Sequence, residues 1–365
     1  MATILSEFDF NLPDERIALR PAQPRSASRL LVASGTLITD ATFADLPKFL
    51  RPGDRLVMND TRVIPARLHG VRKRMPQAGS GLEPAGIQIE VLLTRQHSDG
   101  SWSALARPGR RIRQGDRLIF GNGLTAKVLE KDRKELRLAF NRTGSDFHDV
   151  LGRVGETPLP PYIASRRPVD HRDAEDYQSI FARRPGSVAA PTASLHFDPA
   201  LMDSLCRHGV SVTWITLHVG AGTFLPAPEN ATETETLHPE QGEVSPDAAE
   251  EIGRTRRNGG RIIPVGTTAL RVLETAARTQ PNAQGPVGPW RGETDIFIKP
   301  GFRFHVADAL ITNFHLPGST LLMLVSAFMG LARTRRIYAH AMARDYRFYS
   351  YGDGSFLEPK VKKRP

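Results

Sequence analysis

Apolar side chains take every second position in several short runs between residues 68 and 154, notably 87–93, 124–128 and 136–140. A period of two is that of a β-strand with one buried face. Glycine-rich turns such as 121–123 (GNG) separate the runs at close spacing, with no helical pattern between them. This section therefore predicts a small antiparallel β-barrel or sandwich.

The remainder of the chain alternates strand-like and helical patterns. The predicted strands are residues 55–59, 210–218, 261–265, 294–298 and 310–312, and the second of them is expected to bury Val210, Val212, Trp214 and Ile215. Helices are predicted to begin at Asp198-Pro199 and Ser245-Pro246, because an N-cap residue stands before a proline that fits the first helical position. Residues 267–278 predict a third helix, and Leu321, Leu324, Val325 and Phe328 form the apolar stripe of a fourth.

These two patterns give the domain organisation. Strands that alternate with helices indicate an α/β sheet covered on both faces. We predict an α/β main domain built from both chain ends, residues 1–67 and 155–365. The β-rich section, residues 68–154, is predicted to be an inserted small antiparallel β-barrel domain.

The charge balance of the 365-residue chain points to an anionic partner. Hydrophobic residues make up 40% of the sequence, which indicates a globular protein, and 49 Lys and Arg against 39 Asp and Glu give a net charge of +10. A basic excess is typical of a nucleic-acid binder, although solubility alone also explains it. Because only 7% of the residues are aromatic, we do not expect an extended platform for stacking bases.

Three features predict a cytoplasmic protein that does not enter a membrane. The single Cys206 excludes an internal disulfide and a zinc site made of several cysteines. The amino terminus has no basic segment ahead of an apolar stretch, so we expect no signal peptide. The longest apolar run, 321–332, is shorter than the ~20 residues that span a bilayer. We expect a soluble monomer.

Three segments place a histidine where an apolar run meets a glycine or proline. They are residues 191–197 (PTASLHF), 217–224 (LHVGAGTF) and 310–317 (LITNFHLP), which contain His196, His218 and His315. Such breaks expose side chains at the tips of strands. Imidazole titrates near pH ~6.5 and can therefore take or give a proton at neutral pH. One such histidine is more often structural, but three in the same setting favour a shared site.

Polar and glycine residues beside these histidines are candidates for binding a substrate. Thr192 and Asn313 stand close in sequence to His196 and His315. Gly220, Gly222 and Thr223 form a turn that lets a ligand approach the backbone, although the spacing fits neither a Rossmann nor a Walker motif.

Two further groups of candidates follow predicted strands. Gly266, Thr267 and Thr268 open a helix, and its amino terminus suits a carboxylate or phosphate; plain capping by Thr267 is the alternative. Asn59, Asp60 and Arg62 stand at the carboxyl end of the strand 55–59.

Other residues have a functional and a structural interpretation of similar weight. Asp295 is either a base or ribose-diol acceptor, or a surface turn residue. Asp353 closes the segment 346–353 (YRFYSYGD), which either holds a nucleobase or packs on the sheet as a last strand. Four arginines in predicted turns are candidates for phosphate contacts or for a solvated surface: Arg107, Arg110, Arg111 and Arg113.

The chain resembles the S-adenosylmethionine:tRNA ribosyltransferase-isomerase family along nearly its whole length. Besides the three histidine segments, the matching pieces are 8–13 (FDFNLP), 56–66 (LVMNDTRVIPA), 159–163 (LPPYI), 188–192 (VAAPT), 265–271 (VGTTALR), 294–301 (TDIFIKPG) and 349–353 (YSYGD). Each piece alone is weak, but their number and order make the joint match specific. Ser194 departs from the family pattern, which has glycine there.

The resemblance implies an α/β enzyme with an inserted barrel that modifies tRNA. The ribosyl part of S-adenosylmethionine would move onto 7-aminomethyl-7-deazaguanine at the wobble position, giving epoxyqueuosine-tRNA, adenine and methionine. S-adenosylmethionine is then a consumed substrate, and neither a cofactor nor a metal is implied. We expect His196, His218 and His315 to line the reaction centre, with His196 as the first candidate for proton transfer. Asp295, Thr192, Thr223 and Asn313 would orient the ribose or the modified base.

Two alternatives from other classes remain at this point. An S-adenosylmethionine-dependent RNA methyltransferase would carry a glycine-rich first turn near the start of a doubly wound sheet, and the sequence has none. A non-catalytic tRNA-binding module would use the β-rich insert and keep the histidines as structural residues.

Overall fold

The computed structural model describes residues 5–73, 86–132, 135–220, 237–280 and 285–360. Its contacts divide the chain into two compact units. The first comprises residues 1–61, 178–184 and 190–365, and is thus built from both chain ends; the second comprises residues 62–177 and 185–189. The predicted insert, 68–154, lies within the second unit, and the domain limits proposed from sequence stay a prediction.

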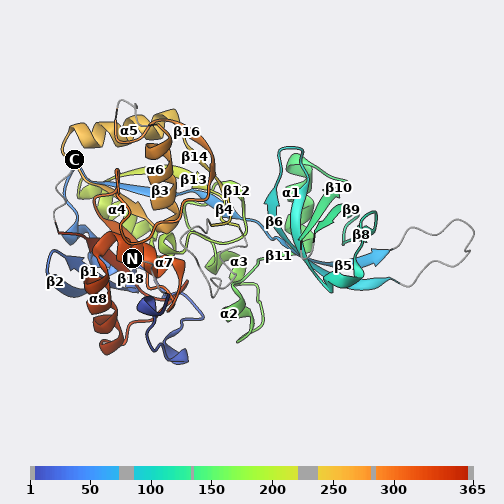
Figure 1. Ribbon diagram of the computed structural model, residues 1–365, viewed down its shortest axis with the longest axis horizontal. Coiled ribbons are helices and arrows are strands. Elements are labelled where there is room, and N and C mark those ends of the chain that lie inside the picture. Colours follow the sequence, from blue (N-terminus) through green and yellow to red (C-terminus); the bar gives the residue numbers. More distant parts are fainter. Residues whose placement is uncertain (1–4, 74–85, 133–134, 221–236, 281–284, 361–365) are drawn as a thin grey trace, which may run out of the picture. The chain divides into compact units, whose positions relative to one another are not determined.

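A mixed sheet of nine strands forms the centre of the described part of the first unit (Figure 1). Its order is β16 (Trp290–Thr294), β14 (Glu240–Val244), β13 (Ser211–Leu217), β3 (Arg55–Asn59), β15 (Ile262–Val265), β17 (Leu310–Asn313), β18 (Gly354–Glu358), β1 (Arg29–Ser34) and β2 (Leu37–Thr42). The four strands β13, β3, β15 and β17 are parallel, so their carboxyl ends meet at one edge of the sheet.

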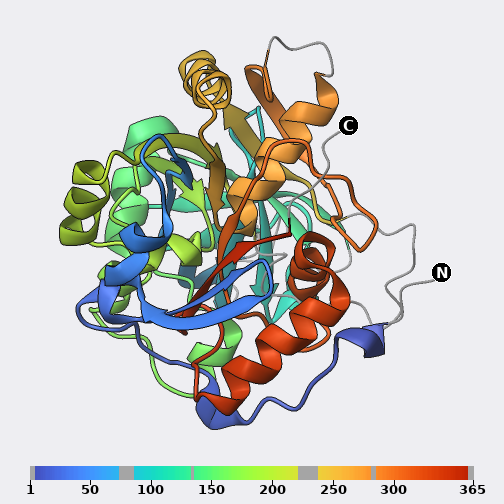
Figure 2. The ribbon, with the colours of Figure 1, turned by 90° about the vertical axis from the view of Figure 1, so that its left-hand side faces the viewer.

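The last strand of the chain joins the two halves of this sheet. β18 runs antiparallel to β17, with Asn313 opposite Gly354, and therefore begins at the edge where the four parallel strands end. β1 is parallel to β18, and β2 returns antiparallel to β1. Figure 2 shows the blue amino-terminal hairpin beside the red carboxyl-terminal segment.

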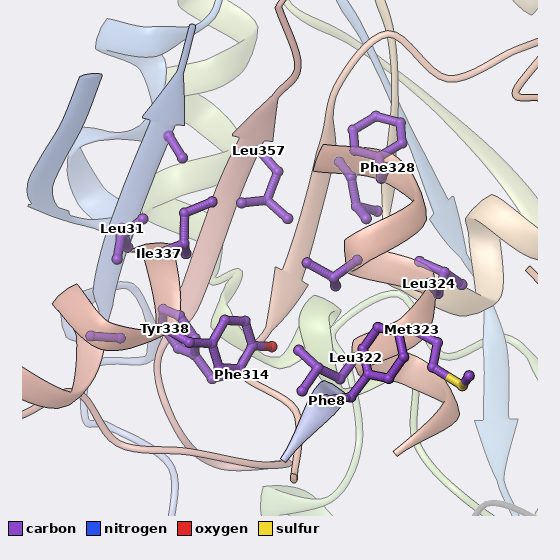
Figure 3. Packing of buried hydrophobic residues seen from close by; sticks show 14 of the residues in the cluster. Phe8, Leu31, Phe314, Leu322, Met323, Leu324, Phe328, Ile337, Tyr338 and Leu357 are labelled. Atoms are coloured by element: carbon purple, nitrogen blue, oxygen red, sulfur yellow. The ribbon is translucent and has the colours of Figure 1, made fainter. Parts of the chain in front are cut away.

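Helices cover both faces of the sheet, as predicted. Val57 of β3 packs with apolar residues of α5 (Pro246–Arg257) and α6 (Thr267–Thr279). Leu56 and Met58 point to the other face and pack with α4 (Pro199–Arg207) and the 3₁₀ segment η4 (Phe43–Phe49). α7 (Thr320–Met329) and α8 (Leu331–Ala343) pack over β17, β18 and β1, where Phe314, Tyr338 and Phe8 belong to one apolar cluster (Figure 3).

The predicted helix starts are confirmed by their capping bonds. The Asp198 carboxylate accepts a hydrogen bond from the backbone N–H of Leu201 at 2.9 Å, and the Ser245 hydroxyl accepts one from that of Ala248 at 3.2 Å. The remaining short segments of the first unit are η1 (Leu5–Phe8), η2 (Asp14–Arg16), η3 (Arg25–Ala27) and η6 (Thr192–His196).

The second unit contains a closed antiparallel barrel, which confirms the predicted fold and decides against a sandwich. Its strands are β5 (Arg67–Lys73), β6 (Ile87–Gln96), β7 (Trp102–Arg107), β10 (Glu135–Phe140), β9 (Thr125–Asp132) and β8 (Arg117–Ile119), and β8 pairs back onto β5. Alternate residues such as Val91, Val128 and Leu138 are fully buried inside it. The other elements are η5 (Gly109–Arg111), α1 (Gly144–Val154), β11 (Gly155–Glu156), α2 (Pro161–Ala164) and α3 (Asp173–Asp176). β4 (Thr61–Val63) and β12 (Arg184–Ser187) form a separate two-stranded sheet.

Two local predictions were wrong. The strand expected at 294–298 is not formed. The strand observed here is β16, which covers the glycine-containing segment 290–294 and pairs with β14. The apolar residues that follow Thr294 pack irregularly against α7. Trp214 was expected to be buried, yet 37% of its surface is exposed. Period-two reasoning predicts which face of the sheet a residue points to, but it does not predict whether that face is covered at that position.

Candidate functional site

The carboxyl edge of the parallel strands brings together most of the predicted site residues. Asn59 ends β3 and Asp60 follows it, His218 follows β13, Gly266 follows β15, and His315 follows β17. Ligands of open α/β sheets bind at such an edge, because loops rather than strands continue from it. The sequence patterns therefore identified groups that the topology gathers in one place.

His196 lies in η6 at the same edge, and both nitrogens and one face of its imidazole contact neighbouring residues. Its Nδ1 lies 2.8 Å from the Ser28 hydroxyl and its Nε2 lies 3.1 Å from Nδ2 of Asn313. An amide nitrogen can only donate, so Nε2 accepts and the proton sits on Nδ1, which donates to Ser28. The Ser28 hydroxyl in turn donates to the carbonyl of Arg25 at 2.8 Å. The imidazole also stacks on the Phe43 ring, with 4.1 Å between centroids.

This environment keeps His196 neutral. Burial lowers its pKa to about 3, and the charges of Arg347 and Arg25 act in the same direction. Because both ring nitrogens are engaged, the described conformation leaves no lone pair or proton for a substrate. The geometry therefore favours a positioning role, in which His196 fixes the amide of Asn313, over the proton transfer that was expected of it first.

Asn313 is fixed from three directions. Its Oδ1 accepts a hydrogen bond from the Thr192 hydroxyl at 3.0 Å, and its Nδ2 donates to the Tyr349 carbonyl at 3.2 Å as well as to His196. Thr192 and Asn313 were both predicted to orient a substrate, and the structure places them in direct contact.

His315 is also buried and neutral. Its Nε2 lies 3.0 Å from the Thr312 hydroxyl, and its backbone N–H donates to the Tyr338 hydroxyl at 3.0 Å. Burial lowers the pKa of His315 to about 3. Tyr338 comes from α8, a helix that the sequence analysis did not predict.

His218 differs from the other two because it is only half-buried. Its Nδ1 lies 2.8 Å from the Thr61 hydroxyl, and Nε2 has no hydrogen-bond partner among the described residues. Burial lowers its pKa, while the nearby Asp60 carboxylate opposes that shift. Asp60 accepts a hydrogen bond from the Thr216 hydroxyl at 2.7 Å. His218 is therefore a neutral imidazole at neutral pH, and its Nε2, which no described residue binds, is left for a substrate.

The side chains of Asn59 and Asp353 form hydrogen bonds with backbone groups of the protein itself. The Asn59 amide donates to the Leu217 carbonyl at 3.0 Å and accepts from the Leu217 N–H at 3.0 Å, which joins the ends of β3 and β13. Asp353 accepts hydrogen bonds from the backbone N–H of Arg29 at 3.0 Å and of Arg347 at 2.8 Å. Both residues organise the edge rather than point away from it.

The amino terminus of α6 has the character of an anion site. Gly266 is its N-cap residue with φ +91°, and no described side chain caps the helix, so the alternative interpretation, capping by Thr267, is not what the structure has. A free amino terminus offers N–H groups and a partial positive charge. The Thr268 hydroxyl oxygen is buried and has no described partner.

A buried ion pair that the sequence did not predict lies at this edge. Glu240 of β14 pairs with Arg271 of α6, and both side chains are 7% exposed. The second carboxylate oxygen of Glu240 accepts a hydrogen bond from the backbone N–H of Gly220 at 3.0 Å. The pair thus fixes the backbone of Gly220, two residues after His218. The only local sign of Glu240 is the segment His238-Pro-Glu240, and a carboxylate beside a proline is equally typical of a solvated loop.

The remaining candidates lie elsewhere or are not described. Asp295 is exposed directly after β16, which runs parallel to β13, so it follows the same edge of the sheet but stands two strands beyond β13. Arg62 is exposed on β4 and is the first residue of the second unit. Gly222 and Thr223 lie outside the described residues. Ser194, next to His196, is fully buried, and its hydroxyl has no partner in the described part of the chain.

The four arginines Arg107, Arg110, Arg111 and Arg113, called here the barrel arginines, are all exposed at the end of β7 and around η5. None of them forms an ion pair with a described residue. The second unit carries 21 Lys and Arg against 14 Asp and Glu, which is +7 of the net +10 of the chain. Most of the net positive charge therefore belongs to the unit that contains the barrel.

Within the described ranges, no three His, Cys, Asp or Glu side chains group in a way that could hold a metal ion. The described helices also include none that is long and apolar enough to cross a membrane.

With this geometry established, comparison with known proteins decides the family. The sequence model of the queuosine biosynthesis protein family matches residues 5–357. The chain belongs to this family. It is 57% identical to the S-adenosylmethionine:tRNA ribosyltransferase-isomerase of Ruegeria pomeroyi, over 97% of this chain and 99% of that protein. It is also 57% identical to the enzyme of the same name from Jannaschia sp., over 98% of each chain.

A solved structure supports the same assignment. The S-adenosylmethionine tRNA ribosyltransferase of Thermotoga maritima is 33% identical, covers 96% of this chain and 99% of its own, and superposes with a TM-score of 0.53. The combination of α/β sheet and inserted barrel is therefore that of the family.

Proposed function

We propose that this queuosine-family enzyme transfers and isomerises the ribosyl moiety of S-adenosylmethionine onto 7-aminomethyl-7-deazaguanine at the wobble position of tRNA. The products are epoxyqueuosine-tRNA, adenine and methionine. The observation that carries the proposal is the meeting of the three family histidine segments at one sheet edge, beside an uncapped helix terminus.

The chemistry requires proton transfers that a neutral imidazole can perform. The sulfonium of S-adenosylmethionine acidifies the adjacent C5′–H, the aminomethyl group must lose a proton to act as a nucleophile, and departing adenine needs a hydrogen-bond donor. A well-placed acid or base contributes roughly 10²- to 10⁴-fold to such steps. We assign proton transfer to His218, because it is the least buried of the three histidines and keeps Nε2 available.

The other residues are proposed to bind and orient. The amino terminus of α6, from Gly266 to Thr268, suits the methionine carboxylate. His196 holds Asn313, and Thr192 completes that contact, so these residues fix the position of the ribose or of the modified base. His315, which contacts Thr312 and Tyr338, lines the buried side of the proposed site. Asp295, at the exposed end of β16, remains a candidate only for the outer part of a bound substrate.

The barrel arginines are proposed to contact tRNA phosphates. Neutralising phosphates releases counterions, so affinity should fall steeply as the salt concentration rises. S-adenosylmethionine is consumed in this scheme, and we propose that the enzyme needs no further cofactor and no metal. We also propose that the protein is cytoplasmic and monomeric.

Product analysis tests the function against its rivals. The protein is incubated with S-adenosylmethionine and tRNA that carries the aminomethyl base, and nucleosides and small products are analysed by mass spectrometry. The proposal predicts epoxyqueuosine with equimolar adenine and methionine. S-adenosylhomocysteine would instead support a methyltransferase, and unconsumed S-adenosylmethionine with bound tRNA would support a non-catalytic module.

A further inference from the structure

Trp214 is an exposed aromatic residue in an inner strand of the main sheet. Val212, two positions earlier on the same face of β13, packs against the apolar cluster beneath α4. Trp214 lies on that face too, yet 37% of its surface is exposed. The indole combines an apolar ring with a polar N–H, so tryptophan is enriched at binding surfaces.

A partly exposed cationic side chain lies over this indole. The guanidinium of Arg183 stands 4.5 Å from the centroid of the Trp214 ring, within the range of a cation–π contact. The Arg183 side chain is itself 56% exposed. Its neighbour Arg184 is 48% exposed and pairs with Glu243 at 2.9 Å. The surface therefore combines an aromatic ring with two partly exposed positive charges.

Direct contacts connect this surface to the candidate reaction site. Arg183 lies 3.4 Å from the carboxylate of Asp60, and the same carboxylate accepts the hydroxyl of Thr216 at 2.7 Å. The residue after Asp60 is Thr61, which contacts His218. Trp214 and His218 are four positions apart along β13 and its end, or about 13 Å at ~3.3 Å per residue.

We infer that Trp214 and Arg183 hold a nucleobase of the tRNA anticodon loop that neighbours the wobble nucleotide; the inference rests on the proposed function. Bases in single-stranded loops are recognised by stacking on aromatic rings and on arginine guanidinium planes. The wobble base must enter the edge near His218, so an adjacent nucleotide of the same loop comes within reach of Trp214. Arg184 and Arg183 match the negative charge of its phosphates.

Tryptophan fluorescence gives a direct test, because the chain has only three tryptophans. Trp102 is 1% exposed inside the barrel unit, and Trp290 is partly buried in β16. An anticodon stem-loop RNA with the aminomethyl base is titrated into the wild type, Trp214→Phe and the matched control Trp290→Phe. The inference predicts quenching of emission in the wild type and in Trp290→Phe, and its loss in Trp214→Phe, which keeps an aromatic ring and binds the RNA.

Affinity and kinetics provide the second test. Stacking of a base is worth ~1–3 kcal/mol, so Trp214→Ala should raise the KM for tRNA about 5- to 150-fold. The KM for S-adenosylmethionine and the thermal unfolding midpoint should not change, and Trp214→Phe should stay within a few-fold of the wild type. Quenching that persists in Trp214→Phe, or an unchanged KM for tRNA in a folded Trp214→Ala, would overturn the inference. Failure of the proposed function would be distinguishable, since the wild type would then release no adenine.

Discussion

The two fully buried histidines make a quantitative prediction for acid unfolding. His196 and His315 have a pKa of about 3 in the folded protein, against ~6.5 for an unperturbed imidazole. The unfolded chain therefore binds a proton on each of them as the pH falls below ~6.5, while the folded protein does not. Their contribution to stability is fully present above pH ~6.5 and is lost progressively as the pH falls towards 3.

The magnitude follows from proton linkage. One pKa unit corresponds to 1.36 kcal/mol, so each histidine costs about 1.4 kcal/mol of stability between pH 7.5 and 5.5. The pair should thus lower the free energy of unfolding by about 2.7 kcal/mol over that interval. Ordinary carboxylates, with pKa values near ~4, stay ionised there and contribute little. His218, whose pKa is also lowered by burial, adds in the same direction.

Urea unfolding at pH 7.5 and pH 5.5 measures this loss in the wild type and in His315→Gln. Glutamine keeps a group near the position of Nε2 that can bond the Thr312 hydroxyl, but it does not titrate. The variant should therefore lose about 1.4 kcal/mol less than the wild type between the two pH values, and its stability at pH 7.5 serves as the internal control. Equal losses in the two proteins would refute the assignment of a neutral, buried His315.

Further predictions concern stability and RNA binding. Ser194→Ala removes a buried hydroxyl without a described partner, so urea unfolding should show no loss or a gain of up to about 1 kcal/mol; a clear loss would reveal an unseen contact. Arg271→Met leaves the Glu240 carboxylate without its cation and should lower the free energy of unfolding by about 3–5 kcal/mol, and Glu240→Gln in the same chain should restore part of it. Replacing the barrel arginines by glutamate should weaken tRNA binding and flatten its dependence on salt; unchanged binding would remove them from the interface.

Local patterns in the sequence predicted much of the fold. The alternation that gives the barrel strands and the N-caps Asp198 and Ser245 act over a few residues, so one sequence contains enough information to locate them. The position of the candidate site also followed, because consecutive parallel strands must end at one edge.

What the sequence did not predict depends on contacts between distant segments. The hydrogen bond between Ser28 and His196 joins residues 168 positions apart, and no local pattern indicates it. This contact and the one with Asn313 engage both ring nitrogens of His196, which is why we propose a positioning role in place of the proton transfer expected from sequence. The exposure of Trp214 is a second case, because it depends on where the covering helices stop.

The rate of adenine release by His218→Ala tests the central assignment most directly. Single-turnover assays with saturating S-adenosylmethionine and tRNA compare this variant with the wild type, and tRNA affinity is measured in parallel. Since a positioned base contributes roughly 10²- to 10⁴-fold, the rate should fall by at least about 100-fold while tRNA affinity is unchanged. A rate within a few-fold of the wild type would contradict the assignment of proton transfer to His218.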